Sequence, residues 1–171
     1  MATSHVGMLV LAEADVLGLC AVLQVRGTFN TEKMAPESYP GGCQVTVYGK
    51  VKPYENLVTA LHREILEELG PDTDQLIGVI EDLATRARIV FESRTEEKEI
   101  VIWATMLDCS FLRSIRLGPD SGGMRLINPH QVKDIYDLRS YAKETGTQYR
   151  NTIAMFEDER KAVEKAFELL S

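Results

Sequence analysis

The sequence is poor in positive charge and has no long apolar run. Its 171 residues contain 19 Lys and Arg against 26 Asp and Glu, which gives a formal net charge of −7. An acidic chain without a basic block is a poor candidate for binding a nucleic-acid polymer through its phosphates. No apolar stretch approaches the roughly 18 residues that a membrane helix needs. We therefore expect neither nucleic-acid binding nor a membrane span.

Cysteine is also scarce. Cys20, Cys43 and Cys109 are odd in number, lie far apart and form no Cys-x-x-Cys pair. This spacing predicts reduced thiols and excludes a disulfide framework or a cysteine-based zinc site. The first residues lack the basic-then-apolar layout of a signal peptide. We therefore expect a cytoplasmic protein.

What the chain does contain is typical of a globular domain. Hydrophobic residues make up 44% of the sequence and charged residues 26%, which suffices for a core and a solvated surface. The length fits one domain, so we expect a single domain over residues 1–171. At this level the acid excess is only a statement about solubility.

Strands and helices are both indicated along the chain. Apolar, β-prone runs separated by Gly, Pro and charged turns predict strands and loops. Strands are expected at 6–11, 16–25, 44–48, 88–92, 100–107 and 124–127, with loops at 26–42, 93–99 and 110–123. The mixture predicts an α/β or α+β fold.

Helix signals are clearest in three places. Asn56 can cap a helix that runs to about Leu69 and ends at Gly70 and Pro71. Asn128 and Pro129 supply an N-cap and first-turn pair for another. After residue 146, apolar residues recur at steps of three and four and predict a long C-terminal helix over about 147–171; they are Tyr149, Ile153, Phe156, Val163, Phe167 and Leu170. This stripe fits either core packing or a dimer interface. Residues 76–83 fit a helix or a strand.

The first helix carries three carboxylates on one side. Because each helical residue turns by about 100°, Glu64, Glu67 and Glu68 lie together at the border of an apolar face. Such carboxylates repel one another, whereas a divalent cation would make the same arrangement favourable. Oxygen ligands of this kind suit Mg²⁺ or Mn²⁺. An exposed, Glu-rich helix face is the alternative interpretation.

The surroundings of these glutamates favour the metal site. The segment Gly49–Gly70 follows the pattern G-x5-E-x7-R-E-U-x-E-E-x-G, in which U is aliphatic; its fixed positions are Gly49, Glu55, Arg63, Glu64, Ile65, Glu67, Glu68 and Gly70. This resembles the box of the Nudix hydrolase superfamily, with every fixed letter present. Pro71 departs from the family, which usually has an aliphatic residue there.

The resemblance implies a Nudix-type α/β/α sandwich with a mixed sheet and a magnesium- or manganese-dependent pyrophosphohydrolase. Glu64, Glu67 and Glu68 would hold the metal, and the carbonyl of Gly49 often adds a ligand. Arg63 would orient the glutamates, so that Glu64, Arg63 and Glu67 count as catalytic, while Glu55 would support the same network. Homodimers are frequent in the family.

The implied chemistry needs a proton acceptor and cations for phosphate. The metal neutralises phosphate oxygens and activates a water, and one carboxylate accepts the proton. The sequence leaves this acceptor open among Glu64, Glu92, Glu96, Glu97 and Glu99. Lys50, Lys52 and Arg26 are the candidates for binding the substrate. We expect cleavage of a diphosphate in a nucleoside-diphosphate-linked or related small molecule.

Two other interpretations remain. The segment before the box resembles the isopentenyl-diphosphate isomerase branch, in which a cysteine precedes the box glycine and a metal-binding histidine follows it. Tyr48 and Lys50 occupy those positions here, which counts against an isomerase. The second alternative is a Nudix-fold module that binds a ligand without turnover, although binding alone does not require all the box glutamates.

Overall fold

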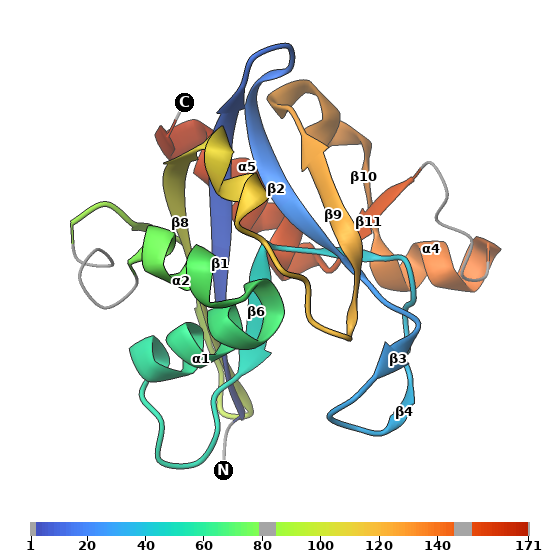
Figure 1. Cartoon of the computed structure of the whole chain (residues 1–171). Helices are drawn as coiled ribbons and strands as arrows, with labels where there is room; N and C mark the ends of the chain where they lie inside the picture. Colours follow the sequence, from blue (N-terminus) through green and yellow to red (C-terminus); the bar gives the residue numbers. More distant parts are fainter. Residues whose placement is uncertain (1–2, 79–84, 146–151, 171) are drawn as a thin grey trace.

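A seven-stranded mixed sheet organises the chain (Figure 1). The computed structural model describes residues 3–78, 85–145 and 152–170. Its central path is β5 (Cys43–Gln44), β2 (Gly18–Arg26), β1 (Thr3–Ala14), β8 (Lys98–Asp108) and β7 (Arg88–Arg94). β1 and β8 are parallel, and the other pairs in this sheet are antiparallel. The predicted mixed sheet is therefore confirmed.

The remaining elements complete two layers around this sheet. β6 (Val47–Lys50) pairs with β1, and β9 (Ser121–Ile127) pairs with β2. Short strands form two separate pairs, β3 (Phe29–Asn30) with β4 (Ala35–Pro36) and β10 (Ile135–Asp137) with β11 (Ile153–Met155). Within the described ranges the helices are α1 (Leu57–Leu69), α2 (Pro71–Ile77), α4 (Leu138–Thr145) and α5 (Glu157–Leu170), with 3₁₀ turns at Cys109–Arg113 and Pro129–Asp134.

Helices α1 and α5 cover opposite faces of the sheet (Figure 1). Because side chains alternate along a strand, β1 supplies both cores. Val6 and Met8 pack on the side of α1, whereas Leu9 and Leu11 pack on the side of α5. All four are at most 1% exposed, and full burial of such a side chain contributes roughly 1.5–3 kcal/mol. This sandwich fixes α1 against the sheet.

Helix α1 begins and ends where the sequence predicts. The Asn56 side chain accepts a hydrogen bond from the Thr59 N–H at 2.9 Å. At the other end the loop after Arg113 supplies donors for carbonyls that the helix leaves free: Gly118 N–H reaches the carbonyl of Glu68 at 3.0 Å. A Cβ at Gly118 would come within 2.6 Å of the Glu67 carbonyl oxygen, so this contact requires glycine.

The sheet forks where β1 changes partner. β6 pairs with residues 5–8 of β1, and β2 pairs with residues 10–14. The fully buried Thr46 hydroxyl lies at the fork, where it accepts from Val10 N–H at 2.8 Å and donates to the Val22 carbonyl at 2.5 Å. The strand predicted at 44–48 is therefore two short strands, β5 and β6, because Thr46 bridges two strands instead of extending one.

The C-terminal helix predicted over 147–171 is wrong over residues 152–156. Ile153 belongs to β11, which pairs in parallel with β10, and the helix begins only at Glu157. Three acidic residues in the first turn of α5 favour that start through the helix dipole. Tyr149, also assigned to the stripe, lies outside the described residues.

Other boundaries shift by less. Pro71, which the sequence predicts only as the end of α1, is also the first residue of α2. The segment predicted from Asn128 has the expected cap, but it forms a 3₁₀ turn before α4. Of the ambiguous segment 76–83, residues 76–77 lie in α2 and residues 79–83 are outside the described part. The three cysteines are free. Across the described ranges, no helix has the length and apolarity to span a bilayer.

The fork predicts a specific cost for Thr46→Val, which keeps the shape of the side chain and removes its hydroxyl. The Val10 N–H and the Val22 carbonyl then lose a buried partner, at about 1–3 kcal/mol for each unsatisfied group. We expect the free energy of unfolding in urea to fall by about 2–4 kcal/mol. Thr46→Ser, which keeps the hydroxyl and loses a methyl group, should cost about 1 kcal/mol. Equal losses in the two variants would contradict this role.

Candidate active site

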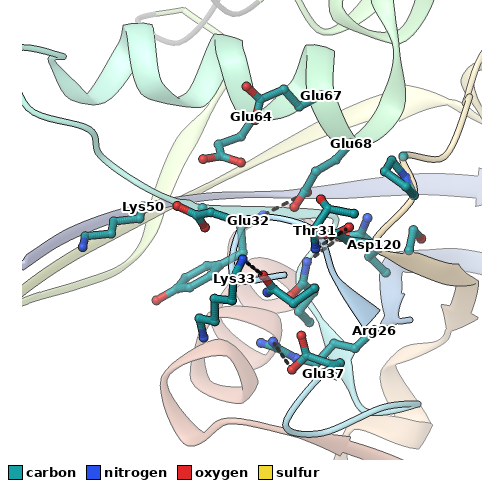
Figure 2. Close-up of a pocket in the computed structure, with 18 of the residues that line it drawn as sticks. Arg26, Thr31, Glu32, Lys33, Glu37, Lys50, Glu64, Glu67, Glu68 and Asp120 are labelled. Atoms are coloured by element: carbon teal, nitrogen blue, oxygen red, sulfur yellow. Dashed lines mark hydrogen bonds and ion pairs between the residues drawn. The ribbon is translucent and has the colours of Figure 1, made fainter. Parts of the chain in front are cut away.

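A cavity of about 790 Å³ lies between α1, β6 and the loops around residues 30–37 and 118–121. The sequence-predicted metal, catalytic and substrate residues all line it: Arg26, Gly49, Lys50, Lys52, Arg63, Glu64, Glu67 and Glu68. Figure 2 shows Glu64 and Glu68 projecting from α1, with Arg26 and Glu37 on the opposite wall. Glu55 is hydrogen-bonded to Arg63 just behind this cavity wall.

Arg63 ties the box together through all five of its N–H donors. Nε and Nη2 bind the two oxygens of Glu55 at 2.7 and 2.9 Å. Nη1 binds Glu64 at 2.6 Å and Glu67 at 3.2 Å, and Nη2 also reaches the Lys50 carbonyl at 2.9 Å. The forked contact with Arg63 lowers the pKa of Glu55 to about 2. The guanidinium therefore fixes both the loop before α1 and the carboxylates on it.

Glycine at position 49 leaves the space that the Glu64 side chain occupies. A Cβ there would overlap the Glu64 carboxylate, so any other residue would displace that carboxylate from its place beside β6. The resulting burial raises the pKa of Glu64, although Arg63 opposes the shift. Glu64 is 9% exposed. The backbone of Gly49 and the Glu64 carboxylate are thereby held side by side.

Glu68, which is half-buried, is the second carboxylate that α1 turns toward this wall of the cavity. Its Oε2 accepts a weak hydrogen bond from the Tyr48 N–H at 3.4 Å. Burial and the nearby charge of Glu64 raise the pKa of Glu68 well above its usual value. The raised pKa values mean that the nearby positive charge does not fully compensate the two carboxylates. Carboxylate oxygens are also the ligands that a hard divalent cation prefers. Glu64 and Glu68 thus fit a Mg²⁺ or Mn²⁺ ion.

Glu67 is arranged differently from its two neighbours. Its side chain is 53% exposed, and its oxygens lie 3.7 Å from Lys52 Nζ and 3.2 Å from Arg63 Nη1. Among the described residues, no group of three His, Cys, Asp or Glu side chains is close enough together to hold a metal ion. Glu64 is near enough to Glu68 for its charge to raise the pKa of Glu68, while Glu67 pairs with basic side chains at the rim.

The opposite wall contains acidic residues that sequence reasoning missed. Glu32, Glu37 and Asp120 line the cavity. Both oxygens of Asp120 accept from the Thr31 N–H, at 3.0 and 3.1 Å, which ties the turn between β3 and β4 to the loop before β9. These positions have no periodic pattern, and only the turn residues Gly118 and Pro119 hinted at a close approach.

The proton acceptors proposed outside the box lie elsewhere. Glu92 is in β7, and Glu96 and Glu97 lie between β7 and β8. Glu99 accepts a hydrogen bond from the Ser4 hydroxyl at 3.1 Å. None of the four is among the residues that line the cavity. Of the five candidates that the sequence left open, Glu64 is the one in the cavity wall.

Comparison with known proteins separates sequence from fold. No protein-family model and no curated protein sequence match the chain. Solved structures do: the Nudix domain of Shewanella oneidensis NrtR, in complex with ADP ribose, superposes with a TM-score of 0.61 at 10% identity, over 100% of this chain and 90% of that chain. The Ap4A hydrolase of C. elegans gives a TM-score of 0.54 at 15% identity, with 100% of both chains covered.

A MutT/nudix family protein from Enterococcus faecalis has the same architecture, with a TM-score of 0.59 at 13% identity. The match covers 98% of this chain but 61% of that one, so the chain spans less than two thirds of that protein. At these identities the likeness concerns the fold alone. Together with the α/β/α layers and the mixed sheet, it shows that this chain has the Nudix fold.

Proposed function

We propose that the protein is a Mg²⁺- or Mn²⁺-dependent pyrophosphohydrolase that cleaves a diphosphate linkage in a nucleoside-diphosphate-linked small molecule. The observation that carries this proposal is a pair of carboxylates with raised pKa values: Glu64, buried beside Gly49, and Glu68, half-buried one helical turn further along α1. Such a pair is destabilising in a metal-free protein and becomes favourable when a cation occupies it. A purely structural helix face has no need of it.

The substrate class is supported by the cavity and the neighbours. Its volume of about 790 Å³ falls in the range typical of small-molecule sites, roughly 300–1,000 Å³. Lys50, Lys52 and Arg26 line it and supply positive charge for phosphate oxygens. The NrtR Nudix domain was solved with ADP ribose, and another neighbour is an Ap4A hydrolase. Both ligand names denote nucleotides with phosphate linkages.

Each residue then has a defined task. Glu64, Glu68 and the Gly49 carbonyl would hold the metal, and Glu67, 3.7 Å from Lys52 Nζ, would add a third carboxylate. The metal supplies charge neutralisation and a water of lowered pKa. Arg63 keeps Glu64 in place, and Glu64 would accept the proton of the attacking water. Lys50 and Lys52 bind the phosphate oxygens.

The first test is hydrolysis by Glu68→Gln and Glu64→Gln. A panel of nucleoside di- and triphosphates, nucleotide sugars, dinucleoside polyphosphates, prenyl diphosphates and coenzymes is incubated with Mg²⁺ or Mn²⁺, and phosphorus NMR follows the products. Because each substitution removes a metal ligand, we expect kcat/KM to fall by at least about 100-fold. The control is Glu168→Gln, an exposed carboxylate on α5, which should retain full activity.

The outcomes of this panel separate the alternatives. Full activity in Glu68→Gln would remove that residue from the site. Ligand binding without cleavage of any substrate would favour the non-catalytic module, and isomerisation of a prenyl diphosphate without phosphate release would favour the isomerase. A proton acceptor other than Glu64 is tested with Glu32→Gln, which should leave kcat unchanged. The homodimer, the cytoplasmic location and the absence of nucleic-acid partners stay predictions.

The second test is thermal denaturation at pH 7.5. The pKa of Glu68 is higher in the folded than in the unfolded protein. Its contribution to stability is therefore fully present at pH values below the unfolded-state pKa and is lost as the pH rises through the folded-state pKa. Without metal, Glu68→Gln should therefore raise Tm by about 2–4 °C, the shift that ~1 kcal/mol gives in a chain of this size. Millimolar Mg²⁺ should raise Tm of the wild type and have little effect on the variant.

This second test does not depend on knowing the substrate. At pH 4 the difference between wild type and Glu68→Gln should shrink, because both side chains are then neutral. If Glu68→Gln is less stable than the wild type at pH 7.5 without metal, the Glu68 carboxylate is stabilised by a partner within the protein and is not an uncompensated metal ligand.

A further inference from the structure

A second cavity of about 530 Å³ adjoins the first on the side of α5. His5, Arg26 and Tyr48 line both cavities. The His5 and Tyr48 rings are stacked, 5.7 Å apart and inclined by 15°, so this boundary is made of two side chains on neighbouring strands. The far side of the second cavity contains Lys98, Arg139 and Lys161. A molecule held at Glu64 and Glu68 would meet this second cavity beyond Tyr48.

Arg26, at the boundary, lacks hydrogen-bond partners. Its side chain is 17% exposed, and the nearest carboxylate oxygens, on Glu37 and Glu159, lie 3.7 and 3.6 Å away. Within the described part of the chain its guanidinium makes no hydrogen bond, and its Nε is buried without a partner. Arg63, in the same cavity, uses all five donors. Since polar groups this buried are normally satisfied, Arg26 is set up to receive an acceptor from a ligand.

Phe156 brings a second guanidinium to the same place. Arg26 and Arg139 lie 5.2 and 5.4 Å from the centre of its ring, and the edge contact with Tyr39 at 5.3 Å holds that ring. Each cation gains from the ring, but two guanidiniums at one ring also repel each other. An oxyanion between or beside them would remove that repulsion and take up their free N–H donors.

The carboxylates in this cavity are committed to other groups. Glu157 receives two hydrogen bonds from Arg160 at 2.9 and 3.0 Å, and Asp137 accepts from Ser140 at the start of α4. Lys98 lies 3.6 Å from Asp158 and Lys161 lies 3.7 Å from Glu157. These separations exceed hydrogen-bond distance, so both ammonium groups keep donors for a further acceptor.

We propose that the second cavity is an oxyanion subsite that binds a phosphate monoester on the distal half of the substrate. Arg26 stands at the boundary, while Arg139, Lys98 and Lys161 contact the monoester. The inference rests on the proposed function for the diphosphate end and narrows the substrate class to diphosphate-linked molecules that carry an additional phosphate.

The test compares two probe pairs that share a diphosphate and differ by one phosphate monoester: NADP⁺ with NAD⁺, and coenzyme A with dephospho-coenzyme A. Binding is measured by calorimetry with Ca²⁺ in place of Mg²⁺, so that a hard cation still lies between the glutamates and the diphosphate, under conditions where no cleavage is detected, and hydrolysis is measured separately with Mg²⁺. We expect the monoester to tighten binding by at least about tenfold in one pair or both, the effect of roughly 1.4 kcal/mol. Hydrolysis should show the same preference in KM.

The variants are Arg139→Gln and Lys161→Gln. Each should lower the ratio of the two affinities in a probe pair toward one, by weakening binding of the probe that carries the monoester and leaving binding of the other probe unchanged. Lys165→Gln is the matched control. Lys161 and Lys165 are both on α5, are 56% and 50% exposed, and each lies near a glutamate, but only Lys161 lines the cavity. The control should keep the wild-type ratio.

Two results would overturn the subsite: a ratio near one in the wild type for both pairs, or a ratio that Arg139→Gln and Lys161→Gln leave unchanged. Failure of the proposed function gives a different pattern. If no probe is hydrolysed but the binding ratio persists and depends on Arg139, the hydrolase proposal fails and the oxyanion subsite stands.

Discussion

Repulsion between Glu64 and Glu68 is the constraint around which the site is arranged. Burial raises the pKa of both carboxyl groups, the charge of Glu64 raises the pKa of Glu68 further, and the charge of Glu67 adds to the shift of Glu64. Two neighbouring segments limit how far α1 and its carboxylates can move. Gly49 lets β6 lie against Glu64 without a Cβ, and the Gly118 N–H binds the carbonyl of Glu68 at the end of α1. Arg63 offsets part of the charge but is bound to Glu55 as well. The protein thus maintains an electrostatic cost that a cation would relieve.

The fork in the sheet explains why a cavity exists at this point. Since β1 pairs with β6 over its first half and with β2 over its second, β2 and β6 diverge, and Thr46 satisfies the backbone groups at the divergence. The buried residues Gln24 and Gln44 bond to each other beside it and line the cavity. A continuous sheet would leave no such opening. The opening between β2 and β6 thus makes the stability of the sheet depend on the Thr46 hydroxyl.

Local sequence signals predicted the wall of the cavity that residues 49–70 form. The opposite wall, around residues 30–37 and 118–121, depends on contacts between segments far apart in the sequence. Asn56 and Gly70 mark α1 because capping acts over a few residues, and the spacing from Gly49 to Glu68 predicted the residues that meet there. The opposite wall depends on contacts such as Gly27 N–H to the Asp120 carbonyl at 2.8 Å, which no periodicity encodes. Ile153 fitted the helical stripe, yet pairing with Ile135 places it in a strand. For the same reason the sequence left the proton acceptor open among five glutamates, of which Glu64 lines the cavity.

The central claim is that Glu64 and Glu68, together with the Gly49 carbonyl, form a divalent-cation site. Crystals grown with Mn²⁺ and measured at an energy where manganese scatters anomalously test it directly. We predict an anomalous peak about 2.0–2.3 Å from an oxygen of Glu64 and an oxygen of Glu68, within reach of the Gly49 carbonyl, and loss of that peak in Glu68→Gln. A wild-type crystal with Mn²⁺ bound elsewhere, or with no peak at this site in millimolar Mn²⁺, would contradict the account.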